Sequence, residues 1–193
     1  MVNKEEYRKR IIVTSGKIFS RYGFKKTSME EIASALKMGK SSIYYYFPGK
    51  EEIFKAVVLY EANILRNELT KAIKSVESPI EKLRNYVFVR MKSFEKLSNY
   101  YNAIFDKNLD HFDFIESVRL KYDREELAIV RLILYHGARM KVFHVPNSEY
   151  TALAVQTVLK GLEVPLFWKK KDLNIEERLN GILDVLFNGI LRK

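Results

Sequence analysis

The sequence contains no cysteine among its 193 residues. Disulfide bonds, thiolate nucleophiles and metal sites with cysteine ligands are therefore excluded. Long apolar runs are also absent, since the densest one, LAIVRLILY at residues 127–135, is interrupted by Arg131 and is too short to span a bilayer. The N-terminus is polar and lacks the apolar core of a signal peptide. These absences predict a cytoplasmic protein without a membrane partner.

Catalytic patterns are lacking as well. The three histidines include no ligand-like i,i+4 pair, and the chain has neither a nucleophile motif nor a glycine-rich phosphate loop. Asp106, Asp110, His111 and Asp113 are close enough in sequence for a metal site, but a solvated helix end is the simpler interpretation. We therefore expect no enzyme activity, no bound metal and no cofactor.

The charge that is present is mostly positive and unevenly distributed. Lys and Arg number 34 against 24 Asp and Glu, a net charge of +10. Residues 1–50 hold 11 basic and 4 acidic residues, a net charge of +7, whereas the other 143 residues hold 23 and 20, a net charge of +3. Such a basic end is typical of a nucleic-acid-binding segment. On charge alone, a solvated basic surface is the alternative.

Almost every segment has the apolar period of an α-helix, and none reads as a strand. The first helix is expected to end at Gly23, the second to begin at Ser28 with Glu31 as its capping-box partner, and the third to cover residues 40–47. Longer helices are expected at about 50–75, 79–97 and 112–137, then from a cap within residues 146–149 to about 168 and from a cap at Asn174 to about 191, with a short aromatic stretch at 99–111. The sequence therefore predicts an all-α protein of about nine helices.

The second and third of these helices form a predicted helix-turn-helix that breaks at residues 37–39. Ile43 and Phe47 are apolar and four residues apart, so they are expected to face the core. The opposite side of that helix would then enter the major groove of DNA. The residues expected on that side are Lys40, Ser41, Ser42 and Tyr45, with Tyr44 and Tyr46 at its flanks.

These outward residues fall into two predicted kinds of DNA contact. Small hydroxyls and a lysine at a helix N-terminus suit base edges, whereas tyrosine hydroxyls and a helix start suit phosphate oxygens. The predicted base contacts are Lys40, Ser41, Ser42 and Tyr45. The predicted phosphate contacts are Thr27, Ser28, Tyr44, Tyr46 and Lys50.

The segment GFKKTSMEEIASALKMGKSSIYYYFPGKEEIF at residues 23–54 resembles the DNA-binding segment of the tetracycline-repressor (TetR) family of bacterial transcription regulators. The matching features are Gly23, Thr27-Ser28, Ile32-Ala33, the three-residue turn, Ile43-Tyr44, Tyr46-Phe47 and Lys50-Glu51. The turn is a departure, because it usually reads small-Gly-Val-Ser in the family and the glycine comes later in this chain.

The resemblance implies a DNA-binding domain at residues 1–50 and a helical effector-binding and dimerisation domain at residues 51–193. It implies a homodimer that binds a palindromic operator in double-stranded DNA, as a repressor released by a small apolar or aromatic effector. A constitutive DNA-binding or nucleoid-associated module without a ligand is the alternative, and a fully packed C-terminal core would favour it.

Two sets of apolar residues are candidates for the dimer interface and the effector pocket. Stripes on the last two predicted helices indicate a dimer interface, although they could also cover the core. Aromatic residues between positions 88 and 143 suggest a pocket, although such residues are often core. The predicted interface residues are Leu153, Thr157, Leu179, Leu183 and Leu186. The predicted pocket residues are Phe88, Phe94, Tyr101, Phe105, Phe112, Ile115 and Tyr135.

Overall fold

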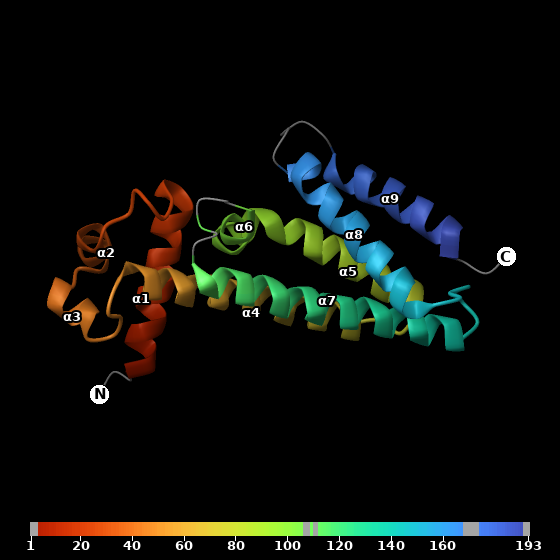
Figure 1. Cartoon of the computed structure of the whole chain (residues 1–193), viewed down its shortest axis with the longest axis horizontal. Coiled ribbons are helices and arrows are strands. Elements are labelled where there is room, and N and C mark those ends of the chain that lie inside the picture. Colours follow the sequence, from red (N-terminus) through yellow and green to blue (C-terminus); the bar gives the residue numbers. More distant parts are fainter. Residues whose placement is uncertain (1–3, 106–108, 110–111, 168–173, 191–193) are drawn as a thin grey trace. The chain divides into compact units, whose positions relative to one another are not determined.

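A computed structural model describes residues 4–105, 109, 112–167 and 174–190, with side chains at all of these except 94, 95, 104, 105, 163–167, 175 and 190. The described residues form nine α-helices and no strand (Figure 1). The helices are α1 (Lys4–Tyr22), α2 (Met29–Leu36), α3 (Lys40–Tyr44), α4 (Lys50–Lys74), α5 (Pro79–Lys96), α6 (Ser98–Phe105), α7 (Asp113–Arg139), α8 (Ser148–Phe167) and α9 (Ile175–Ile190). The predicted all-α fold is confirmed.

The chain divides into two compact units, and each unit is built from two separate stretches of sequence. The first unit contains Met1–Leu65 and Leu97–Val118, and the second contains Arg66–Lys96 and Arg119–Lys193. Helices α4 and α7 therefore contribute residues to both units. None of the helices in the described part of the chain combines the length and the apolar character needed to cross a bilayer.

The first unit packs α1, α2, α3 and α6 with the beginning of α4 around an apolar and aromatic core. Ile11, Ile32 and Ile53, from α1, α2 and α4, are fully buried. The rings of Phe19 and Phe54 meet edge to face with centroids 5.2 Å apart, a favoured arrangement of aromatic pairs. This core holds the helix-turn-helix in place.

A buried polar network fastens the start of α6 inside the first unit. The Glu61 carboxylate accepts hydrogen bonds from Asn99 Nδ2 at 2.6 Å and from the Tyr100 N–H at 2.9 Å. Asn99 Nδ2 also donates to the Gly16 carbonyl oxygen at 2.9 Å, which links α6 to α1 as well as to α4. Burial raises the pKa of Glu61 above its ordinary value of 4.5, and the hydrogen bonds from Asn99 and Tyr100 act in the opposite direction.

The second unit contains α5, α8 and α9 with the remaining parts of α4 and α7. Tyr86, Met91 and Leu134 are fully buried there. Arg90 and Glu126 form a bidentate ion pair within this core, with Nε–Oε1 and Nη2–Oε2 distances of 2.8 and 3.1 Å. The paired geometry compensates for the loss of hydration that burial imposes on both charges.

Candidate nucleic-acid interface

Local hydrogen bonds fix the turn between α2 and α3. Ser28 is the N-cap of α2: its hydroxyl accepts the Glu31 N–H and the Glu31 carboxylate accepts the Ser28 N–H, so the predicted capping box is confirmed. Helix α2 ends at Leu36, and its C-cap residue Lys37 has a φ of 53°, in the left-handed region. Gly39, with a φ of −65°, is the N-cap of α3. The left-handed residue of the turn is thus a lysine, and the later glycine does not supply that conformation.

Helix α3 has one buried side and one exposed side. Ile43 and Phe47 are buried, which confirms their predicted orientation. The helix itself ends at Tyr44 rather than at Phe47, and Tyr45 and Tyr46 continue as a turn. The exposed side carries Lys40, Ser41, Ser42, Tyr44 and Tyr45.

The three consecutive tyrosines have different surroundings. Tyr45 is the most exposed at 69%, Tyr44 is exposed at 44%, and Tyr46 is half-buried. The Tyr46 ring stacks on Tyr7 of α1 with centroids 6.1 Å apart, and it meets the Tyr45 ring edge to face at 5.1 Å. Tyr46 therefore packs the turn after α3 against α1, whereas Tyr44 and Tyr45 are available to a partner.

Helix α1 supplies two basic residues to this region that sequence reasoning missed. Lys4 Nζ lies 5.0 Å from the Tyr45 ring centroid, and Lys4 is exposed. The Arg8 guanidinium lies 4.2 Å from the Phe47 ring centroid and donates to the Tyr46 carbonyl oxygen at 3.1 Å. These contacts join residues about forty positions apart in the sequence, so no local pattern could have indicated them.

Besides Ser28 and Tyr46, two more of the predicted phosphate contacts have internal partners in the structure. Thr27 is only 2% exposed, and its hydroxyl donates to the Gly23 carbonyl oxygen at 2.8 Å. Lys50 Nζ donates to the carbonyl oxygens of Phe24 and Thr27 at 2.9 and 2.8 Å, and it lies 4.4 Å from the Phe24 ring centroid. Both residues therefore stabilise the chain that leads into α2.

An ion pair links the two helices of the helix-turn-helix. Lys40 Nζ contacts Glu30 Oε1, and the two side chains are 47% and 64% exposed. The hydrogen bond from Lys40 lowers the pKa of Glu30, and the same bond raises the pKa of Lys40. Sequence reasoning missed Glu30, because an acidic residue is not expected on a surface that meets phosphates.

The described residues of the predicted pocket are divided between the two units. Tyr101 and Ile115 are buried in the first unit, where Phe112 also packs against Phe24 with centroids 5.3 Å apart. Phe88 and Tyr135 belong to the second unit, and Tyr135 is exposed. Phe94 and Phe105 lie outside the described side chains. The single aromatic pocket therefore stays a prediction, and none of these described residues lines the cavity that the second unit contains.

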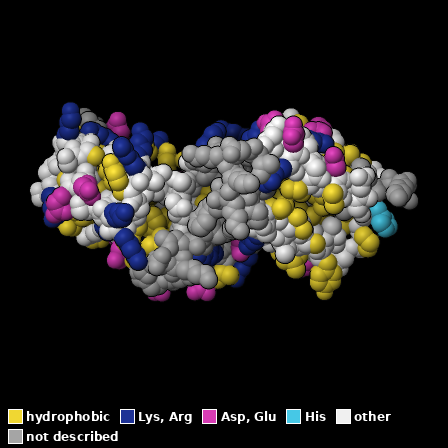
Figure 2. Space-filling view, turned by 90° about the horizontal axis from the view of Figure 1, so that it is seen from above, with side chains coloured by type: hydrophobic (Ala, Val, Ile, Leu, Met, Phe, Trp, Pro, Cys, Tyr) yellow, Lys and Arg dark blue, Asp and Glu magenta, His cyan; other side chains and the backbone are white. Residues whose placement is uncertain are grey.

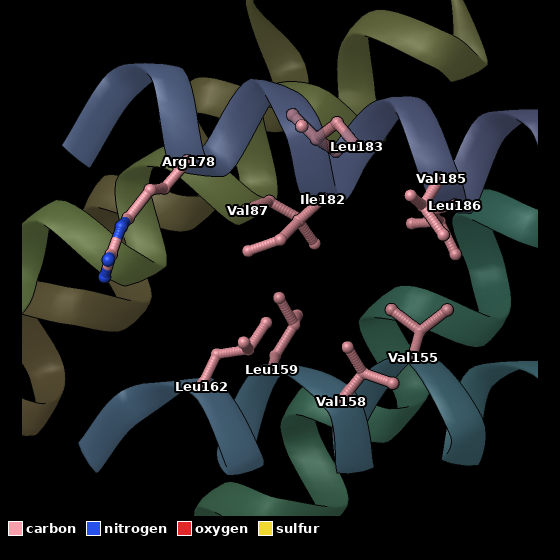
Figure 3. Close-up of a pocket in the computed structure, with 11 residues that line it drawn as sticks. Val87, Val155, Val158, Leu159, Leu162, Arg178, Ile182, Leu183, Val185 and Leu186 are labelled. Atoms are coloured by element: carbon pink, nitrogen blue, oxygen red, sulfur yellow. The ribbon is translucent and has the colours of Figure 1, made fainter. Parts of the chain in front are cut away.

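The second unit has an apolar cavity in a different place. Its volume is about 550 Å³, and it lies between α8 and α9 with α5 behind them (Figure 3). Arg178 stands at one edge with its guanidinium turned away from the aliphatic side chains. The lining residues are Val87, Val155, Val158, Leu159, Leu162, Arg178, Gly181, Ile182, Leu183, Val185 and Leu186.

The predicted interface residues divide between core and surface. Leu179 and Leu183 are 0% exposed within a single chain, so their assignment to a dimer interface is wrong. Leu153 and Thr157 are exposed, and Leu186 is half-buried at the cavity. Helical period alone did not separate the inner from the outer side of α9, because that helix has apolar residues on both.

Basic side chains and potential metal ligands are the remaining groups that could bind a partner or an ion. Dark blue Lys and Arg side chains are spread over the part that holds α1 to α3 (Figure 2). Lys25 and Lys26, which precede α2 in the sequence, are exposed. No group of three or more potential metal ligands occurs among the described residues. Asp106, Asp110 and His111 of the predicted acidic cluster lie outside them.

An exposed five-residue helix held by a tight turn against a capped partner helix, in an all-helical protein, is the geometry of a helix-turn-helix. Residues 11–57 match the family of bacterial regulatory proteins known as the tetR family. The HTH-type transcriptional regulator YhgD of Bacillus subtilis is 24% identical over 185 residues, which cover 92% of this chain and 93% of YhgD.

Two solved structures have the same fold. The crystal structure of a transcriptional regulator from Cytophaga hutchinsonii has a TM-score of 0.79 and 28% identity, and the match covers 95% of this chain and 98% of that one. AibR in complex with isovaleryl coenzyme A and operator DNA has a TM-score of 0.69 and 17% identity, over 93% and 97% of the two chains. Residues 11–57 of the chain are thus a tetR-family segment, and the chain is similar over nearly its whole length to HTH-type transcriptional regulators in sequence and in fold.

Proposed function

We propose that this chain is a homodimeric repressor that binds a palindromic operator and is released from it by a small apolar effector. The observation that carries the proposal is the exposed side of α3. Ile43 and Phe47 anchor that helix in the core, and the polar side chains opposite them are free to enter a major groove. DNA binding is assigned to residues 1–50, and effector binding and dimerisation to residues 51–193.

Within the DNA-binding residues the contacts are of two kinds. Lys40, Ser41, Ser42 and Tyr45 are assigned to base edges because they are exposed on α3. Tyr44 and the Ser28 helix start are assigned to phosphates. Thr27, Tyr46 and Lys50 are assigned to support of the helix-turn-helix, because their side chains pack or bond internally.

Exposed apolar residues support the homodimer. Tyr150, Leu153 and Val158 on α8 and Val185 on α9 are each about half or more exposed. Yellow hydrophobic side chains gather over the part that holds α8 and α9 (Figure 2). A second copy of the same surface would remove these side chains from water, as in an isologous two-fold interface. Thr157 lies on the same exposed side of α8.

The cavity between α8 and α9, whose lining residues Val158 and Val185 also belong to the exposed apolar surface, supports an effector. The described side chains of its walls are aliphatic and include no aromatic ring, so an acyl or other aliphatic group suits it better than an aromatic one. Arg178 at the edge would pair with a carboxylate or phosphate on the same molecule. AibR, whose fold is similar, is bound to isovaleryl coenzyme A in its crystal structure. Release then follows if the effector favours a dimer with differently spaced α3 helices.

Selection of duplexes from a random-sequence pool tests the proposal. The protein should retain a palindromic sequence, and a panel of aliphatic acids and acyl-coenzyme A compounds should contain a member that lowers its affinity for that duplex. Retention of one sequence with no releasing compound would favour a constitutive DNA-binding module. Failure to retain any sequence would contradict sequence-specific binding.

A further inference from the structure

The ion pair between Glu30 and Lys40 stands where α3 would meet DNA. Lys40 is the first residue of α3, and its ammonium is in contact with the carboxylate of Glu30 in the first turn of α2. The ammonium also lies 6.0 Å from the Tyr44 ring centroid. A base edge or phosphate that Lys40 reaches is therefore within a few ångströms of the Glu30 carboxylate.

This placement is unfavourable for contact with a phosphate. A phosphate that approaches Lys40 must either displace Glu30 or bear the repulsion between two anions at short range. A guanine edge presents the neutral acceptors N7 and O6, which can take a second ammonium hydrogen while the first stays with Glu30. The neighbouring carboxylate can also accept a hydrogen bond from the N4 amino group of cytosine.

We propose that Glu30 is a specificity-determining residue. Its ion pair with Lys40 disfavours contact between Lys40 and phosphates, leaves contact with base edges possible, and so weakens binding to DNA of arbitrary sequence. The inference rests on the proposed role of α3 in DNA binding. Phosphate contacts supply most of the non-specific affinity for DNA. An acidic residue that prevents one lysine from contacting a phosphate therefore lowers the non-specific affinity more than the affinity for the operator. Affinity for the operator falls less, since the base contact is retained. The ratio of specific to non-specific affinity therefore rises.

A charge-neutral substitution tests the proposal on two duplexes, one recovered by selection and one of random sequence. Glu30→Gln should raise affinity for the random duplex by roughly fivefold, the scale of an exposed ion pair, and affinity for the selected duplex by clearly less. The salt dependence on the random duplex should steepen by up to about one unit, because Lys40 then neutralises one more phosphate.

The chain offers a matched control. Glu176 and Lys92 form another exposed ion pair, in the second unit, at 2.5 Å. Glu176→Gln removes the same negative charge and the same type of bond, so it reports the effect of net charge alone. Equal gains for Glu30→Gln and Glu176→Gln would overturn the proposal, and so would equal gains of Glu30→Gln on both duplexes.

A double-mutant cycle isolates the ion pair itself. In a Lys40→Gln background, Glu30→Gln should leave affinity for the random duplex unchanged within about twofold, because the lysine that Glu30 withholds is gone. A gain that persists without Lys40 would mean that Glu30 acts through repulsion alone, contrary to the proposal. If the wild-type protein selects no sequence, the proposed function fails, while the random duplex still tests the role of Glu30.

Discussion

At the scale of single residues, Lys37, in the turn between α2 and α3, has a positive φ and therefore a conformational free-energy cost that glycine would avoid. A side chain with Cβ in this conformation costs about 1–2 kcal/mol relative to glycine, part of which is offset by the greater freedom of glycine in the unfolded chain. Lys37→Gly should therefore raise the free energy of unfolding by about 1 kcal/mol and the melting temperature by about 2–4 °C. Thermal and urea unfolding measure the change.

Gly23, in the same unit, allows the opposite test, in which a side chain is added to a residue with positive φ. Gly23 has a φ of 81° and no atom near the position of an added Cβ, so only backbone strain opposes a side chain there. Gly23→Ala should destabilise the protein by about 1 kcal/mol. A loss of stability in Lys37→Gly would contradict the left-handed turn, and Lys37→Ala serves as a control that keeps a Cβ in place.

Glu61 makes stability depend on pH in an unusual direction. Its pKa is raised in the folded chain, so between the unfolded value near 4.5 and the folded value the folded state binds more protons than the unfolded state. The free energy of unfolding contributed by Glu61 is therefore highest at low pH and is lost as pH rises through the folded pKa. Urea titrations at several pH values should show that the free energy of unfolding falls less steeply with rising pH in Glu61→Gln than in wild type. Glu116→Gln, at an exposed position on α7, should behave like wild type.

At the scale of elements, the end of α7 depends on a close contact. Phe143 is buried after the helix, and its N–H donates to the Gly137 carbonyl oxygen at 3.1 Å. A Cβ on Gly137 would overlap the Phe143 ring. Gly137→Ala should destabilise the protein by about 1–3 kcal/mol, the usual cost of overpacking. The double substitution Gly137→Ala with Phe143→Leu should be more stable than the sum of the two single effects predicts; additive losses would argue against the contact.

The bounds of the helices were more predictable from the sequence than the contacts between side chains of different helices. The N-terminal starts of α2, α5 and α9 were predictable from Ser28, Pro79 and Asn174, because N-caps and a proline in the first turn act on the backbone of that turn alone. The contact of Lys4 with Tyr45 was not predictable, because it depends on how α1 packs. Leu183 was assigned to the wrong side of α9 for a related reason: apolar period identifies a buried helix face without identifying what buries it.

At the scale of the whole molecule, the proposed homodimer predicts opposite outcomes for two neighbouring residues of α9. Val185 is 77% exposed, so Val185→Glu should leave the chain folded and give a monomer in light scattering, with weaker binding to a palindromic duplex. Leu183 is buried, so Leu183→Glu should unfold the second unit, because an unpaired charge is costly in a core.

A surface control separates dimer loss from a change in charge. Asn67 is exposed on α4, and Asn67→Glu adds the same charge as Val185→Glu. It should remain a dimer. A wild-type protein that is monomeric at micromolar concentration would remove the basis of the prediction, as would a Val185→Glu variant with the mass of a dimer.

The two-stretch construction of the first unit has a consequence for protein synthesis. The helix-turn-helix is translated within the first 50 residues, yet Asn99 and Tyr100, which bond to Glu61 beneath it, follow a segment that belongs to the other unit. Domains usually fold in order from the N-terminus as the chain leaves the ribosome. In this chain the first unit is completed only after α6 has emerged, so shorter nascent chains carry the helix-turn-helix and its apolar core without the hydrogen bonds that α6 makes to α1 and α4.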